Sequence, residues 1–169
     1  MNLRKADNDD LIFLFELRNE QVVRENSFNT YPIGLDQHMA WFANRVSSPD
    51  CLLFIAENDG KKIGQIRYEL DGPDNEALVS LAIVPDERGK GFGADVLRAG
   101  CEHVLREKGP TRFVAYIKSV NISSIKTFKK VGFKDAGAEY YQGQQCLKMI
   151  MATAGEKIVK LPGSCPDLP

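Results

Sequence analysis

The chain has few of the residues that bind metal ions. It contains two histidines and four cysteines, and the cysteines at positions 51, 101, 146 and 165 show neither metal-ligand spacing nor a Cys-x-x-Cys pair. Zinc would need a cluster of such ligands, so the sequence predicts no metal site. Cys51 and Cys101 stand in apolar runs, which predicts buried free thiols in a reducing cytoplasm.

Long apolar runs and an excess of charge of one sign are also missing. No stretch reaches the roughly 18 consecutive apolar residues of a membrane span, and residues 1–6 lead into a charged segment without a signal-peptide core. The 22 basic and 23 acidic residues leave a formal net charge of −1. The sequence therefore has no excess of basic charge that would predict binding to nucleic acid or to anionic lipid. These absences predict a cytoplasmic protein with neither a membrane nor a nucleic-acid partner.

The 169 residues contain no repeats and no low-complexity segment. We expect one domain over residues 1–151 and a loosely held, proline-containing tail over 152–169. Apolar patterning predicts strands at about 2–6, 51–56, 62–70, 77–84, 112–117, 133–136 and 145–151. It predicts helices at about 7–17, 35–46 and 91–107 and from 121 onward, with turns at 58–60 and 71–75. Residues 18–34 are predicted to be irregular.

The most informative segment is Leu81–Gly93. An apolar run ends at a proline, a basic and glycine-rich turn follows, and apolar residues at helical spacing come next. This order predicts a strand, a loop and a helix N-terminus, which together can bind phosphate groups. Gly89, Gly91 and Gly93 would let the backbone approach an anion closely. No Gly-Lys-Ser/Thr sequence follows, which excludes a Walker loop, and the glycine intervals fit the dinucleotide fingerprint poorly.

A second motif lies about thirty residues downstream. Asn121 is a good helix N-cap, Phe128 follows seven residues later, and Gly132-Phe133 ends the segment. A capped amphipathic helix would explain each of these residues singly. It does not explain why this helix follows the glycine-loop unit by one strand.

Together the two motifs resemble those of the GNAT superfamily of N-acetyltransferases. Arg88, Gly91 and Gly93 match its Arg/Gln-x-x-Gly-x-Gly/Ala pattern, and the order of elements is similar from Asn2 to Met151. The resemblance implies an α/β (α+β) fold: one mixed, twisted central sheet of about seven strands, splayed in the middle and flanked by about four helices. It further implies that acetyl-CoA, as co-substrate, lies in the V-shaped gap and that a primary amine attacks its thioester.

The resemblance also implies which residues contact the cofactor, through loop amides, the strand that carries the pantetheine and the second motif. These residues are Leu81, Ile83, Arg88, Gly89, Lys90, Gly91, Phe92, Gly93, Ala94, Asn121 and Phe128. The oxyanion would meet a backbone N–H near Ala82 or Ile83, where the family places a strand bulge.

Proton removal from the acceptor amine needs a base. Along 62–70, Gln65, Arg67 and Glu69 alternate with apolar residues, so one face of this strand is polar. Glu69 is the first candidate base, directly or through water, and His38 is the second. An ion pair between Glu69 and Arg67 explains Glu69 equally well.

The general acid is unassigned. Phe128 occupies the position at which the superfamily usually carries a tyrosine that protonates the leaving thiolate. Water could protonate the thiolate, or one of three tyrosines could reach the site: Tyr116, Tyr140 or Tyr141.

The acceptor side is formed by residues 17–42. This segment resembles N-acetyltransferases of the pseudaminic acid pathway, which act on the 4-amino group of a UDP-linked 4-amino-4,6-dideoxy sugar. The resemblance implies that Arg18 and His38 contact the nucleotide diphosphate, that Phe28 and Trp41 offer apolar or stacking surface, and that Arg67 lies near the same ligand. Alternatively, Arg18 caps a helix C-terminus, while His38 and Trp41 share a partly buried helix face.

Two other functions stay open. Related acetyltransferases act on a protein N-terminus or a ribosomal protein, and the loss of tyrosine at Phe128 leaves room for a non-catalytic coenzyme A sensor. The partner expected from the first reading is a small-molecule amine, and homodimerisation is left open.

Overall fold

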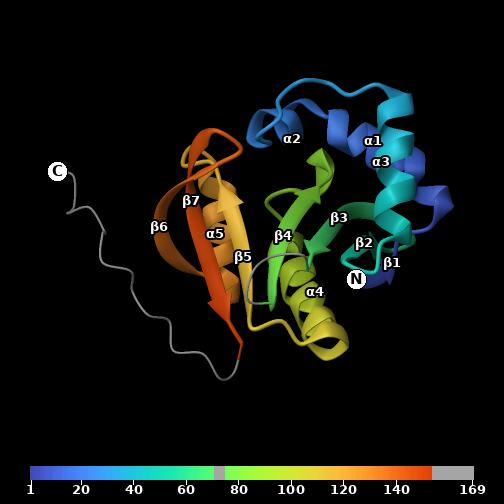
Figure 1. The fold of residues 1–169 in the computed structure, drawn as a ribbon. Helices are drawn as coiled ribbons and strands as arrows, with labels where there is room; N and C mark the ends of the chain where they lie inside the picture. Colours follow the sequence, from blue (N-terminus) through green and yellow to red (C-terminus); the bar gives the residue numbers. More distant parts are fainter. Residues whose placement is uncertain (71–74, 154–169) are drawn as a thin grey trace.

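A mixed, seven-stranded sheet runs through the molecule in the order β1-β2-β3-β4-β5-β7-β6 (Figure 1). The computed structural model describes residues 1–70 and 75–153. The strands are β1 (Asn2–Lys5), β2 (Cys51–Asn58), β3 (Lys61–Glu69), β4 (Glu76–Ile83), β5 (Arg112–Ile117), β6 (Lys134–Tyr141) and β7 (Gln144–Ala152). The helices are α1 (Leu11–Asn19), α2 (Gln21–Asn26), α3 (Leu35–Ser47), α4 (Phe92–Lys108) and α5 (Ile122–Val131), with short 3-10 turns at Asn8–Asp10 and Pro85–Glu87.

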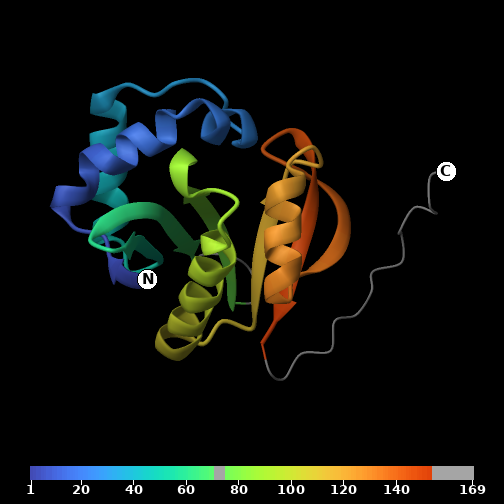
Figure 2. The same ribbon diagram turned by 180° about the vertical axis from the view of Figure 1, so that it is seen from behind.

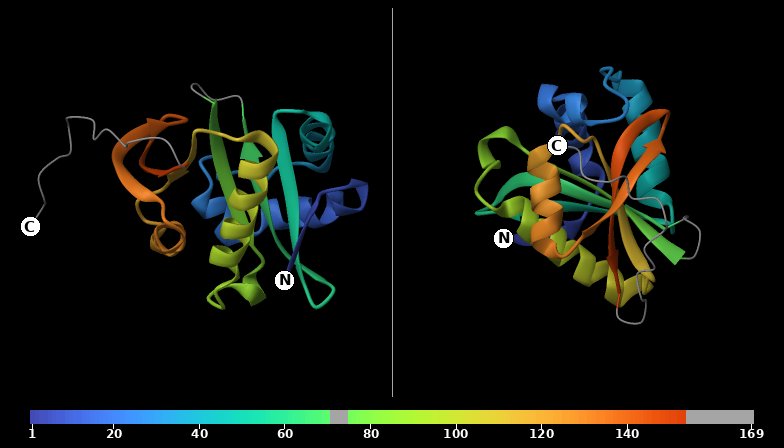
Figure 3. Two further views of the ribbon diagram at one scale, coloured as in Figure 1. Left: turned by 90° about the horizontal axis from the view of Figure 1, so that it is seen from below. Right: turned by 90° about the vertical axis from the view of Figure 1, so that its left-hand side faces the viewer.

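Helices cover both faces of this sheet. Helices α4 and α5 lie together on one face, and α1 and α3 lie on the other (Figures 2 and 3). The larger apolar core lies between the sheet and the α4–α5 pair, and a smaller one forms under α1 and α3 around Leu14, Phe42 and Ile55. The observed architecture is the predicted α/β fold with a single mixed sheet.

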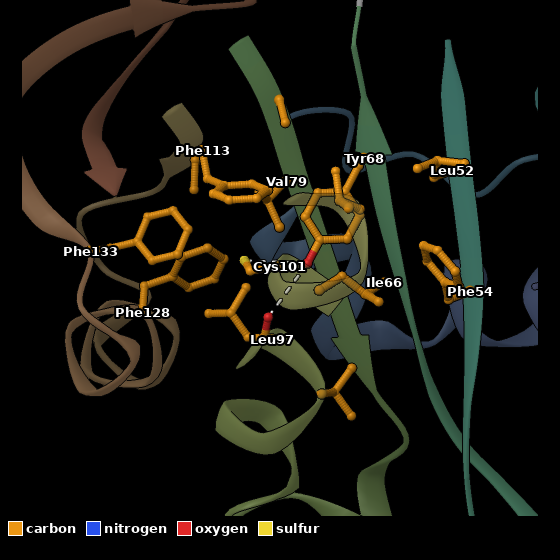
Figure 4. Close-up of a cluster of buried hydrophobic side chains, with 14 of the residues drawn as sticks. Leu52, Phe54, Ile66, Tyr68, Val79, Leu97, Cys101, Phe113, Phe128 and Phe133 are labelled. Atoms are coloured by element: carbon orange, nitrogen blue, oxygen red, sulfur yellow. Dashed lines mark hydrogen bonds between the residues drawn. The ribbon is translucent and has the colours of Figure 1, made fainter. Parts of the chain in front are cut away.

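The larger core is packed around Tyr68 of β3, which is fully buried (Figure 4). Its hydroxyl approaches the Leu97 carbonyl and the Cys101 thiol of α4, each at 3.5 Å. A Cβ atom at Gly100 would lie 2.5 Å from Tyr68 Oη, so only glycine allows α4 to pack this closely. The three described cysteines, Cys51, Cys101 and Cys146, are buried, as predicted for the first two.

The sheet splays where β4 and β5 meet. These parallel strands pair only at Glu76–Arg112, Ala77–Phe113 and Leu78–Val114. Beyond Leu78 the two strands diverge (Figure 1), and this leaves the V-shaped gap that the family resemblance implied. The gap is open at the same end as the loop that precedes α4.

Several local expectations were wrong. Residues 18–34 contain the short helix α2, so the described residues hold five α-helices rather than four. The pairing of β3 with β4 runs in continuous register from Gly64–Ile83 to Glu69–Leu78, so no register shift accompanies the bulge expected near Ala82 or Ile83. A register shift lies instead between β2 and β3, at Ala56 and Glu57.

The last hairpin is longer than the patterning predicted. Strand β6 reaches Tyr141, and β7 reaches Ala152, after which Thr153 bonds to the carbonyls of Pro110 and Thr111. The predicted turn at 71–75 lies outside the described residues except for Asn75. The predicted tail lies outside them from residue 154 onward.

A buried carboxylate fixes the start of α1. Asp10 is fully buried and accepts two hydrogen bonds from Arg4, at 2.7 and 2.9 Å, and one from the backbone N–H of Asp7. Lys62 Nζ lies 2.7 Å from the same carboxylate. Asp10 therefore joins β1 and β3 to the start of α1.

Among the helices of the described residues, none is long and apolar enough to span a bilayer.

Candidate active site

A cleft of about 820 Å³ occupies the gap between the diverging ends of β4 and β5. Residues 78–83 of β4 and 115–117 of β5 form its walls, the loop before α4 and one side of α5 line one end, and α1, α2 and α3 line the other. The two ends correspond to the cofactor and acceptor sides predicted from the sequence.

The glycine loop is shaped to bind an anion. Gly89 and Gly91 have φ values of +75° and +94°, and a Cβ at either residue would meet no atom of the described residues within 4 Å. Gly91 is the N-cap of α4 and has no side chain to bind the free N–H groups of the first helical turn. These groups and the helix dipole are therefore available to phosphate oxygens, so the loop fits the diphosphate of coenzyme A.

Gly93 differs from the other two glycines of the loop, because its φ is not positive. A Cβ at this position would make an ordinary contact of 3.4 Å with Thr127 Cγ2 of α5, so neither the backbone nor the space requires glycine here. Of the predicted cofactor residues, Leu81, Ile83, Gly89, Gly91, Gly93 and Ala94 all line the cleft.

Three side chains of the predicted loop set are used in other ways. Arg88 lines the cleft, but its Nε donates to the Ile83 carbonyl and its Nη2 lies 2.6 Å from Glu20 Oε2. Lys90 pairs with Glu87 at 3.0 Å, and Phe92 packs against the larger core. The side chains of Lys90 and Phe92 are not part of the cleft lining, although their backbone belongs to the loop.

The Arg88–Glu20 pair links the two ends of the cleft. Glu20 also caps α2, because its carboxylate accepts from the backbone N–H groups of Val22 and Val23. One arginine thus connects the end of β4 to the helix that begins the acceptor side. The sequence offered no local signal for this contact, because the two residues lie 68 positions apart.

Helix α5 forms the wall beside the glycine loop. Asn121 caps it by accepting from the Ser124 N–H at 3.2 Å, as predicted, and lines the cleft. Phe128 is buried edge-to-face against Phe133, with 4.8 Å between the ring centroids. Lys126 and Lys130 also line the cleft on this helix, and the sequence interpretation did not name them.

The candidate acids are separated by the structure. Tyr116 and Tyr141 line the cleft and stack on each other at 4.3 Å, whereas Tyr140 is 74% exposed and does not line the cleft. Burial raises the pKa of Tyr141. A neutral Tyr141 hydroxyl at neutral pH is a proton donor, so two of the three tyrosines remain candidates.

All five predicted acceptor residues meet at the other end of the cleft: Arg18, Phe28, His38, Trp41 and Arg67. His38 stacks on Trp41 at 5.2 Å, and the Arg67 guanidinium lies 5.4 Å from the centre of the same ring. Arg18 stands in the last turn of α1 and donates to the Asn29 carbonyl at 2.8 Å. The alternative in which His38 and Trp41 share a face of α3 is therefore confirmed as a packing contact. The Asn29 carbonyl lies outside the helices, so this bond of Arg18 is not a helix C-cap.

Polar atoms without partners gather at this end. Within the described residues, the buried side-chain atoms that make no hydrogen bond are Arg18 Nη1, both ring nitrogens of His38, Gln65 Oε1 and Arg67 Nε. All four residues line the cleft. An unsatisfied buried polar group costs about 1–3 kcal/mol, and the concentration of five such atoms in one place is typical of a binding site.

The electrostatics of this cluster favour an anion. Burial lowers the pKa of Arg18, and the positive charges of Arg24 and Arg67 add to the effect. Burial also lowers the pKa of His38; the Leu11 backbone opposes this shift and Arg18 reinforces it. His38 is therefore neutral at pH 7, with one N–H donor. Arginine guanidinium groups and a neutral imidazole suit a carboxylate or a phosphate.

Glu69 is held by two arginines. Its Oε1 lies 3.3 Å from Arg67 Nε and 3.2 Å from Arg45 Nη2, so the ion pair considered for it is present. Glu69 lines the cleft, but it pairs with Leu78, four residues from Ala82 along β4. At about 3.3 Å per residue this separation is roughly 13 Å. If Glu69 is the base, it acts through water.

A short roof closes the acceptor end over the gap. The Phe28 ring packs edge-to-face on Tyr141 at 5.0 Å, and Gln144 Nε2 donates to the Phe28 carbonyl at 2.6 Å. Lys118 donates to the Glu25 carbonyl at 2.9 Å. The segment after α2 therefore contacts the far side of the cleft.

The described residues hold no group of three or more side chains suited to a metal ion.

Known proteins resemble the chain in sequence and in fold. L-methionine sulfoximine/L-methionine sulfone acetyltransferase from Pseudomonas aeruginosa is 28% identical over 149 residues, which cover 85% of this chain and 86% of that protein. The aminoglycoside acetyltransferase AAC(6')-Ib, solved with ribostamycin and coenzyme A, superposes with a TM-score of 0.79 at 19% identity, over 89% of this chain and 92% of the other. A ribosomal-protein-alanine N-acetyltransferase from Brucella melitensis gives 0.74 at 23% identity, over 90% and 100%.

A family model describes most of the chain. The model of the acetyltransferase (GNAT) domain matches residues 1–134, from β1 into the start of β6. This match includes both motifs, the splayed strands and every residue of the unpartnered cluster. The chain belongs to the GNAT family of acetyltransferases.

Proposed function

We propose that this acetyltransferase transfers the acetyl group of acetyl-CoA to the primary amine of a small molecule that also carries an anionic group. The amine nitrogen attacks the thioester carbon, a C–N bond forms, the C–S bond breaks, and the thiol of coenzyme A leaves with a proton. The loop amides and the end of α4 hold the diphosphate, and the free edge of β4 beyond Leu78 faces the pantetheine.

The choice of an anionic acceptor rests on one observation. The unpartnered atoms of Arg18 and His38 are hydrogen-bond donors, apart from one imidazole nitrogen. Arg18 is cationic, and so is the neighbouring Arg67, which is paired with Glu69. An anionic group would satisfy them, whereas a polyamine or an aminoglycoside would bring further positive charge beside the two arginines. The roof at Phe28 favours a small acceptor over a protein N-terminus, which needs an open groove.

Two acceptors of this kind have separate support. The acceptor segment resembles enzymes that act on UDP-4-amino-4,6-dideoxy sugars, whose diphosphate Arg18 and His38 would bind and whose rings Trp41 and Phe28 would contact. The relative from Pseudomonas aeruginosa is named for L-methionine sulfoximine and L-methionine sulfone, amino acids whose carboxylate lies next to the amine. Both molecules carry the amine and the anionic group that the proposal requires.

A thioester-release assay over a panel of amines tests the proposal. The panel contains a UDP-4-amino-4,6-dideoxy sugar, L-methionine sulfone, spermidine, kanamycin and a peptide with a free N-terminus. We expect release with one or both of the first two and little with the others. Release with the peptide alone would support the protein acceptor, and release with none would support the coenzyme A sensor; either result would reject the proposal.

The donor site is tested by Gly91→Glu. A carboxylate at φ +94° strains the backbone and places negative charge where the diphosphate binds. We expect a loss of at least about 100-fold in coenzyme A affinity, measured by calorimetry. Gly60→Glu is the matched control, because Gly60 has φ +74° and open space in the β2–β3 turn, far along the chain from the loop. Normal coenzyme A affinity in Gly91→Glu would overturn the assignment of the loop.

A further inference from the structure

The amine must be held beside the thioester, and the anionic site alone does not do this. Residue pairing shows which side chain of β3 lies closest to the reacting end of β4. Gln65 pairs with Ala82, Arg67 with Ser80 and Glu69 with Leu78. Since the oxyanion is expected near Ala82 or Ile83, Gln65 is the first polar residue of β3 along the path from the thioester to the anionic site.

The side chain of Gln65 is unusual for a residue in this position. It lines the cleft, it lies on the same face of β3 as Arg67 and Glu69, and its Oε1 is buried without a hydrogen-bond partner among the described residues. The neighbouring Arg67 has the Trp41 ring and Glu69 as partners. The Gln65 amide oxygen is therefore a hydrogen-bond acceptor without a partner among the described residues, next to the expected position of the thioester.

We propose that the Gln65 amide oxygen accepts a hydrogen bond from the nucleophilic amine of the acceptor and directs its lone pair toward the thioester carbon. This inference rests on the function proposed above. It makes Gln65 the residue that selects for an amine, while Arg18 and Arg67 select for the anion. Adjacent same-face residues on a strand are about 6.6 Å apart, so the acceptor should carry its amine and its anionic group within roughly that distance of each other.

The lack of charge on its side chain explains why glutamine suits this role. A carboxylate here would strongly stabilise the protonated ammonium, which is not a nucleophile, whereas a neutral amide oxygen stabilises it less and still accepts a hydrogen bond from the free amine. Gly64, which faces the other side of the sheet, lets β3 approach the end of β4 closely: a Cβ there would lie 2.5 Å from the Ala82 carbonyl. On the cleft side, the neighbour of Gln65 along β3 is the cationic Arg67.

The test compares Gln65→Leu with wild type, using L-methionine sulfone and the UDP-4-amino-4,6-dideoxy sugar as acceptors. We expect kcat/KM to fall about tenfold or more with the acceptor that wild type uses, mainly through kcat, because a misdirected amine reacts slowly. The coenzyme A affinity should stay at the wild-type value, and the thermal midpoint should not fall, because the variant removes a buried oxygen that has no partner among the described residues. Gln145→Leu, on the exposed side of β7, is the matched control and should behave as wild type.

A second measurement separates contact with the amine from a general effect on the cleft. The analogue of the preferred acceptor that lacks the amine should bind wild type and Gln65→Leu equally, by calorimetry. Unchanged kcat/KM in Gln65→Leu, or an equal loss of affinity for the amine-free analogue, would reject the role of Gln65 while leaving the proposed function in place. Turnover of neither acceptor by wild type would reject both.

Discussion

Asp10 and His38 are the buried polar residues of the described chain, and α1 separates their two environments. Asp10 lies before the first residue of α1 and has Arg4, Lys62 and a backbone N–H around its carboxylate. His38 packs on Phe15 in the middle of the same helix, with Arg18 and the Leu11 backbone nearby, and neither of its ring nitrogens forms a well-aligned hydrogen bond with a described residue. The chain thus supplies the partners of Asp10, whereas in the proposed function the acceptor would supply those of His38.

The largest effect on stability is expected at Asp10 and its two cationic partners, Arg4 and Lys62. Asp10→Ala should lower the free energy of unfolding by about 3 kcal/mol, because it removes the shared partner of Arg4 and Lys62. Chemical denaturation at pH 7 measures this change. Asp95→Ala removes a surface pair with Arg98 and should cost no more than about 1 kcal/mol. Equal losses in the two variants would mean that the buried carboxylate of Asp10 contributes no more to stability than a surface ion pair does.

The same cluster makes stability depend on pH. Hydrogen bonds from Arg4 and Lys62 outweigh the effect of burial and hold the pKa of Asp10 well below its ordinary value of 3.8. The stabilisation is therefore complete above about pH 4 and is lost as the pH falls toward the folded-state pKa. The difference in unfolding free energy between wild type and Asp10→Ala should shrink by up to about 1.4 kcal/mol per pH unit below pH 4. A difference that does not vary with pH would contradict this assignment.

A smaller effect, on acceptor binding alone, is expected at Arg18, which has a buried nitrogen without a partner among the described residues. Arg18→Ala should raise KM for the anionic acceptor by about 10- to 100-fold, the value of a hydrogen bond to a charged group, and should leave KM for acetyl-CoA unchanged. Arg98→Ala, on the exposed side of α4, is the matched control. An unchanged acceptor KM would mean that Arg18 serves only to bond the Asn29 carbonyl.

The smallest effect has the opposite sign. His38→Leu should raise the free energy of unfolding by about 1 kcal/mol at pH 7.5, because it removes buried polar atoms that have no partner, and it should weaken acceptor binding. The pKa of His38 is lowered in the folded state, so wild type loses stability as the pH falls below about 6.5 and the variant does not. Denaturation at pH 7.5 and pH 5.5 checks both points. A destabilised His38→Leu variant would place His38 with Asp10, among the residues that serve the fold.

The sequence predicted the parts of the site that local patterns encode. The glycine loop, the Asn121 cap and the alternating face of β3 depend on neighbours in the chain, and the structure places them as expected. Helix α2 was missed because it is six residues long with two adjacent valines, and its Glu20 cap is anchored by Arg88 far along the chain. The importance of Gln65 needed the pairing with Ala82, and the burial of Asp10 needed strands β1 and β3.

The three-pair contact between β4 and β5 has a thermodynamic consequence. Because so little backbone bonding crosses between the two halves of the sheet, a molecule lying in the gap becomes part of what holds them together. A ligand that binds only this folded form adds its binding free energy to that of folding, which is about 2.7 kcal/mol when its concentration is 100 times Kd. The melting temperature of this enzyme should therefore follow the concentration of its acetyl donor in the cell.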